Sequence, residues 1–172
     1  SKKYKRCCLP KERHQTSGGL LWSYAGKMHR IQDADDYPVE ACYLNTDWKE
    51  QGLARIVVTR SQNDGRAMVG VFLVDIFCLG VKNAFCKEGL TRRQIEDELL
   101  PRYYQNEEPT IIGINYAKEI IYGAVDYARS LGFEPHPDFE LSRHVLGTEE
   151  FSRTRRLQFG GPEGKPLYIA GP

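Results

Sequence analysis

The sequence predicts an α+β fold: a mainly antiparallel sheet centred on residues 69–77, with helices packed on one face. Three observations support this class. An apolar, β-branched run occupies residues 69–79, as in a strand covered on both faces. The strong turn signal Asn-Asp-Gly at 63–65 separates this run from another β-rich run at 53–59. A helical period of apolar residues then follows near 116–131.

The first part of the chain is expected to be mainly strands. Residues 20–31 fit either a helix or a coil, and residues 39–44 have strand composition. Asn45-Thr46-Asp47 resembles a turn or a helix cap, and Trp48 is expected to pack against the core. The runs at 53–59 and 69–77 should then pair as an antiparallel hairpin.

Three helices are predicted next. Thr91 to Gln94 has capping-box form and starts a helix that should stop at Pro101. The second helix ends at Gly132, and a third short helix starts at the N-cap Asp138 and ends at Gly147. The apolar face of the second helix comprises Ala117, Ile120, Ile121, Ala124, Val125, Ala128 and Leu131.

The end of the sequence predicts a closing hairpin. Residues 157–159 and 166–169 are separated by a glycine-rich loop at 160–165. That loop lacks the spacing of a phosphate-binding P-loop. The expected element order is therefore β-β-β-α-α-α-β-β.

Length and composition predict one domain and narrow the function classes. A chain of 172 residues can bury one sizeable core, and 24 Lys and Arg against 23 Asp and Glu give no overall charge argument for a polyanion partner. Five cysteines, an odd number, and the lack of a long apolar run favour a reducing, cytoplasmic location without a membrane partner. The first residue is Ser, so we expect part of a longer polypeptide.

Residues 1–16 form a basic segment, which the Ser-Gly-Gly joint at 17–19 separates from a single α+β domain covering 17–172. Its first eight residues, SKKYKRCC, resemble the second half of the SEC-C motif, a small zinc-binding tail of the form CxCGSGKKYKKCC. The resemblance implies that Cys7 and Cys8 are zinc ligands and that the basic residues around them form a positive surface. Those basic residues are Lys2, Lys3, Lys5 and Arg6.

The chain carries only half of such a zinc site. The first cysteine pair of the motif is missing, and its GSG turn is reduced to Ser1. A structural zinc takes four ligands, so His14, solvent or residues outside this sequence would have to complete the site. The alternative is that Cys7 and Cys8 bind nothing in this chain.

Asp75 lies within the apolar run, where an ionised carboxylate is costly unless it is paired or used. It could serve a metal-dependent hydrolase or nuclease together with His136 or a second carboxylate. The structural alternative places Asp75 near the strand end, bound to backbone amides, Lys82 or an arginine. The candidate second carboxylates are Glu119, Asp126, Asp138 and Glu140.

His136 lies between two prolines, ahead of Asp138, and fits either a base or metal ligand or a polar residue of a rigid turn. Cys78 and Cys86 lack the local signature of a nucleophile, and Cys78 is expected to be a small core residue.

A second basic cluster follows the third helix and lies beside Phe151 and Phe159; it comprises Arg153, Arg155 and Arg156. Such a cluster can contact phosphates while aromatic rings stack on bases, or it can protect a strand edge from pairing. The leading hypothesis is a non-catalytic module that contacts nucleic acid, a ribonucleoprotein or a protein partner through both basic segments. The rival hypothesis is the hydrolase or nuclease built on Asp75.

Overall fold

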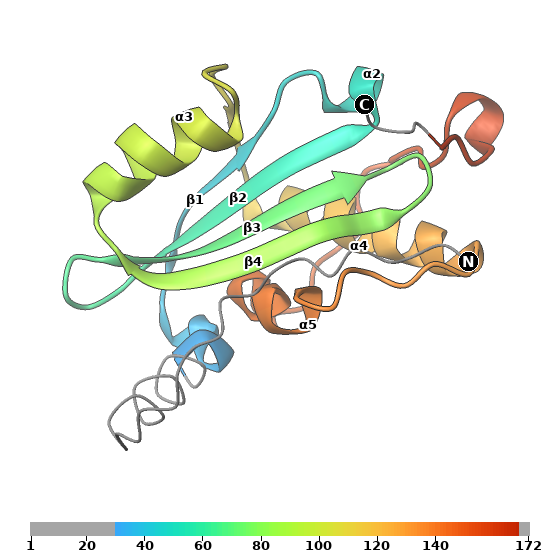
Figure 1. Cartoon of the computed structure of the whole chain (residues 1–172). Coiled ribbons are helices and arrows are strands. Elements are labelled where there is room, and N and C mark those ends of the chain that lie inside the picture. The colour runs from blue at the N-terminus through green and yellow to red at the C-terminus, as the bar shows by residue number, and fades with distance from the viewer. Residues whose placement is uncertain (1–29, 169–172) are drawn as a thin grey trace, which may run out of the picture.

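A computed structural model describes residues 30–168, and its centre is a five-stranded antiparallel sheet with the order β4-β3-β2-β1-β5 (Figure 1). This confirms the predicted α+β class and the antiparallel sheet. The strands are β1 (Val39–Leu44), β2 (Leu53–Ser61), β3 (Ala67–Asp75), β4 (Gly80–Leu90) and β5 (Thr110–Ile112).

The predicted hairpin is β2–β3, paired without interruption from Leu53 opposite Asp75 to Ser61 opposite Ala67. Gly65 has φ +74°, which suits glycine at the turn, and its amide donates to the Gln62 carbonyl at 3.2 Å. The apolar run up to Asp75 is therefore an interior strand, with β2 on one side and β4 on the other, whereas its last residues, 76–79, form the turn into β4.

Two strands were not predicted. β4 alternates buried and exposed positions and contains charged residues and Gly89, so it lacks a continuous apolar run. β5 has three residues, too few for a period to be recognised. Its pairing with β1 extends the sheet beyond the strands that the sequence indicated.

One face of the sheet is covered by α4 (Ile114–Ser130), α5 (Phe139–Ser142) and the 3-10 turn η3 (Arg143–Leu146). The inward side chains of β2 and β3, such as Ile56 and Phe72, pack there against Ile120 and Ile121 of α4. The predicted second and third helices are thus confirmed on this face.

The structure differs from the prediction that all helices share one face. The π-helical segment η2 (Gln94–Leu99) and α3 (Leu100–Tyr103) lie on the opposite face, shown in yellow-green in Figure 1. Strands β2 and β3 also carry apolar side chains there, including Val57, Val69 and Val71, which need a cover of their own. The helix also continues past Pro101, because proline is tolerated at the first positions of α3.

The segment between β1 and β2 behaves as a turn. Trp48 begins α2 (Trp48–Gln51) and is 6% exposed, which confirms its predicted place in the core. Asn45 spans the turn: its side chain donates to the Leu53 carbonyl at 3.0 Å and accepts from the Arg55 amide at 2.7 Å.

The predicted closing hairpin is wrong for the described residues, since 157–168 contain no strand. The amides of Gly160 and Leu167 donate to the Ile76 and Phe77 carbonyls, at 2.8 and 3.2 Å. Residues on both sides of the 3-10 turn η4 (Pro162–Gly164) thus bond to the turn after β3. Within residues 30–168, no helix is long and apolar enough to cross a membrane.

Candidate functional site

Two of the three predicted arginines are paired with acidic residues of α4. Arg153 lies 2.5 Å from the Asp126 carboxylate, and the Arg155 guanidinium lies 3.2 Å from that of Glu119. Both guanidinium groups remain about half exposed. These pairs attach the segment after residue 150 to α4.

Glu119 is the centre of this attachment. Its buried carboxylate accepts hydrogen bonds from the Arg155 amide at 3.1 Å and from the Thr154 hydroxyl at 3.2 Å. Burial raises the pKa of Glu119, but these hydrogen bonds and the Arg155 charge outweigh it, so the pKa lies below its ordinary value. Glu119 is therefore a structural carboxylate.

Arg156 differs from its neighbours because it forms no ion pair with any of residues 30–168. It lines a pocket of about 440 Å³ between α2, the turn after β3 and the glycine-rich loop. Lys49 lines the same pocket and likewise has no carboxylate partner in this part of the chain. The pocket therefore has two available positive charges.

Aromatic rings lie beside these charges. The Lys49 ammonium is 5.4 Å from the centroid of the Trp48 ring, which meets the Tyr116 ring edge-on at 6.4 Å. The Arg155 guanidinium lies 4.4 Å from the Tyr116 centroid. The two aromatic rings thus lie between two cations, and Trp48 and Lys49 line the same pocket as Arg156.

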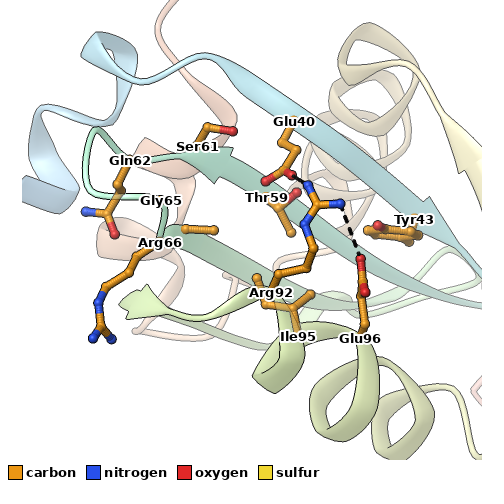
Figure 2. A pocket seen from close by; sticks show the side chains of 11 residues that line it. Glu40, Tyr43, Thr59, Ser61, Gln62, Gly65, Arg66, Arg92, Ile95 and Glu96 are labelled. Carbon is orange, nitrogen blue, oxygen red and sulfur yellow. Dashed lines mark hydrogen bonds and ion pairs between the residues drawn. The ribbon is translucent and has the colours of Figure 1, made fainter.

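A smaller pocket of about 170 Å³ lies between β1, β2 and the start of η2 (Figure 2). Figure 2 shows Arg92 reaching across it, 2.5 Å from the Glu40 carboxylate and 3.7 Å from that of Glu96. Burial raises the pKa of Tyr43 in its wall, and the two glutamates add to the rise. Because Arg92 pairs with both glutamates and Arg66 binds Asp64 and the Gly89 carbonyl outside the lining, this pocket offers few free groups to a ligand.

Asp75 is buried at the end of β3, and its Oδ1 accepts hydrogen bonds from the Phe77 and Cys78 amides at 2.9 and 3.0 Å. These contacts agree with the alternative in which Asp75 binds backbone amides near the strand end and has a structural role. Two of the candidate second carboxylates, Glu119 and Asp126, instead bind arginines, and Glu140 lies 3.4 Å from Arg143.

His136 is held in its turn by local contacts. Its amide donates to the Val81 carbonyl at 2.9 Å, and its Nδ1 accepts from the Asp138 amide at 3.2 Å. Asp138 occupies the N-cap position of α5, as predicted, although its side chain makes no capping hydrogen bond. The structure brings His136 and Asp138 together, with 3.8 Å between Nδ1 and the carboxylate.

The predicted zinc ligands Cys7 and Cys8 and the basic residues 2–6 lie outside the described residues. Within residues 30–168, no three or more His, Cys, Asp or Glu side chains are grouped so that they could hold a metal ion. Cys42, Cys78 and Cys86 are free thiols there. Burial raises the pKa of Cys42 to about 11 and also raises that of Cys78, which keeps these thiols protonated.

Sequence reasoning missed two buried cations, Arg60 and Lys118, which are 6% and 3% exposed. The signals were present: Arg60 follows Ile56 and Val58 on the inward side of β2, and Lys118 shares the apolar face of α4.

Comparisons of the chain with protein-family models, curated protein sequences and solved structures found no match.

Proposed function

We propose that this chain is a non-catalytic module that binds single-stranded nucleic acid at the pocket beside Arg156. The observation that carries the proposal is the pair of available cations, Arg156 and Lys49, in one pocket next to a row of aromatic rings. Such surfaces bind strands through phosphate contacts and base stacking with little sequence preference.

Each group has a stated part in this proposal. Arg156 and Lys49 contact phosphate oxygens, and bases stack on Tyr116 and Phe77, which are both partly buried at this edge. The Arg155 guanidinium packs on one face of the Tyr116 ring. Arg153 is a weaker contact, because its charge is already balanced by Asp126.

The N-terminal segment adds the second half of the proposal. Lys2, Lys3, Lys5 and Arg6 supply further phosphate contacts, and Cys7 and Cys8 contribute two ligands of a zinc whose remaining ligands come from elsewhere. A cytoplasmic location suits the three free thiols. Elemental analysis of the full-length polypeptide tests the zinc: one zinc per chain is expected, and its absence would contradict this half.

Binding of labelled single-stranded RNA and DNA at several salt concentrations tests the main proposal. Affinity should fall steeply with salt, and Arg156→Gln and Lys49→Gln should each reduce the slope of log affinity against log salt by about 1. Because phosphate contacts carry no sequence information, the loss should be similar for different sequences.

Arg93→Gln is the matched control, since it removes the same charge from a residue on η2's side of the molecule, where Arg93 pairs with Asp97. It should leave affinity nearly unchanged. Salt-insensitive or absent binding by the parent would reject the nucleic-acid proposal and leave a protein partner as the target of this surface. Equal losses in Arg93→Gln and Arg156→Gln would show that only overall charge matters.

A further inference from the structure

A third pocket, of about 390 Å³, lies between α4, η3 and the loop at 147–151. Lys118 of α4 lines it although the residue is only 3% exposed. Arg143 and His144 of η3 also line it, together with Tyr122 and Phe151. This pocket shares no residue with the one that contains Arg156.

The Lys118 ammonium has N–H donors that bind no acceptor among residues 30–168. It makes one hydrogen bond within residues 30–168, to the Glu149 carbonyl at 2.8 Å, whereas an ammonium group has three N–H donors. A buried cation with unused donors is unfavourable unless a further acceptor can reach it.

The nearby Asp35 carboxylate, which is partly exposed, is already engaged elsewhere. Asp35 accepts from the amide and hydroxyl of Thr148 and lies 3.5 Å from Arg60. The Arg60 guanidinium in turn donates to three backbone carbonyls, those of Ala34, Tyr37 and Val145. Lys118 therefore shares its surroundings with a second buried cation and has no hydrogen-bonded carboxylate among the described residues.

The walls add an apolar surface and further charge. The rings of Tyr122 and Phe151 are stacked, with centroids 5.4 Å apart and planes at 23°. The Arg143 guanidinium is 47% exposed and lies 3.4 Å from Glu140, so part of its surface stays open. Glu149 and Glu150 also line the pocket and oppose an anion, but both are exposed to the screening of solvent.

We propose that this pocket binds a small oxyanion, the phosphate or carboxylate group of a small molecule, with Lys118 as the principal ligand. Arg143 and His144 contact the same group from the rim. The stacked aromatic wall favours oxyanions attached to a flat, apolar group.

Titration calorimetry of the full chain at constant ionic strength tests this site with inorganic phosphate, phenyl phosphate and benzoate. One saturable site is expected, with phenyl phosphate bound more tightly than phosphate. The ratio of phenyl phosphate to benzoate affinity then separates a phosphate site from a carboxylate site. Lys118→Met should weaken binding by about tenfold or more, because it removes a charge-assisted hydrogen bond.

Surface variants keep the test decisive if Lys118→Met fails to fold. Arg143→Gln should weaken binding several-fold, and the double change Glu149→Gln with Glu150→Gln should tighten it, because it removes the opposing charges. Arg93→Gln should have no effect. Absence of saturation with all three probes would overturn the proposal, as would unchanged affinity in both Arg143→Gln and the double variant.

Arg156→Gln separates this inference from the proposed function. It should leave phosphate affinity unchanged while it weakens nucleic-acid binding. Phosphate binding that is lost in Arg156→Gln and kept in Lys118→Met would place the anion in the pocket beside Arg156. That result would overturn this inference and leave the proposed function standing.

Discussion

Gly147 is the residue at which a single added methyl group should do the most damage near Arg60. It follows η3 with φ +87°, and a Cβ placed there would overlap the Arg60 guanidinium and the Asp35 carboxylate. The glycine thus lets the loop at 147–151 lie directly on the ion pair between the buried Arg60 and the more exposed Asp35.

Gly147→Ala should therefore cost stability through both backbone strain and overlap. Gly132→Ala is the matched control, because Gly132 has φ +89° and open space around its Cα. Strain should cost the control about 1–2 kcal/mol, whereas Gly147 has φ +87° and ψ 161°, a region almost restricted to glycine, so strain of about 1–3 kcal/mol and overlap of about 1–3 kcal/mol should both contribute there. Urea unfolding measures both, and equal losses would contradict the proposed contact.

At the scale of elements, the segment formed by η2 and α3 is attached to the sheet by two tyrosines. The hydroxyls of Tyr103 and Tyr104 donate to the carbonyls of Phe72 and Arg55, at 2.8 and 3.1 Å. Tyr104 is 2% exposed and packs on Val57 and Val71. The attachment thus combines apolar burial with hydrogen bonds to β2 and β3.

Tyr104→Ala should cost about 3–5 kcal/mol, and Tyr104→Phe, which removes only the hydroxyl, about 1 kcal/mol. Hydrogen exchange of amides at 94–104 should accelerate more than exchange within β2 and β3, because this segment loses its anchor first. Tyr168→Ala is the control, since Tyr168 is 64% exposed and should change stability by less than about 0.5 kcal/mol. Uniform acceleration across the sheet would contradict a local role.

At the scale of the whole molecule, Asp35 joins parts of the chain that are far apart in sequence. It connects η1 (Ala34–Asp36) to Arg60 in β2 and to Thr148 after η3. Burial raises its pKa, but the Thr148 hydrogen bonds and the charges of Arg60 and Lys118 outweigh this, so its pKa lies below the ordinary value. A lowered pKa means that the ionised form favours the folded state.

Stability from Asp35 should therefore be present above the ordinary aspartate pKa, about 3.9, and be lost as the pH falls through the lower folded value. Asp35→Asn should flatten the fall in unfolding free energy between about pH 5 and pH 2. Other carboxylates with lowered pKa values, including Glu119, keep part of the slope. Urea unfolding across this range checks the effect, and identical slopes in parent and variant would contradict it.

The sequence predicted those parts of the fold that depend on local signals. The turn at 63–65 identified the β2–β3 hairpin, and the apolar period identified α4. β4 and β5 were missed because their pairing depends on neighbouring strands rather than on their own composition. The closing hairpin was wrong because Gly160 and Leu167 bond to Ile76 and Phe77, and the segments on either side of the glycine-rich loop form no strand ladder.

The candidate site was less predictable for the same reason. The arginine cluster was visible in the sequence. Its pairing was not predictable, because Asp126 and Glu119 precede Arg153 and Arg155 by 27 and 36 residues. Lys49, which joins Arg156 in one pocket, lies in a different part of the chain. Partners that are distant in sequence decide which of these charges stay available.

The two strands at the borders of the sheet also bear on self-association. β5 offers only three residues, and Glu107, Glu108 and Pro109 precede it. β4 is longer, but it carries Lys82, Lys87 and Glu88, and the His136 amide already occupies the Val81 carbonyl. Short length, charge and an occupied carbonyl all hinder the addition of a further strand, so this sheet is a poor template for fibril growth.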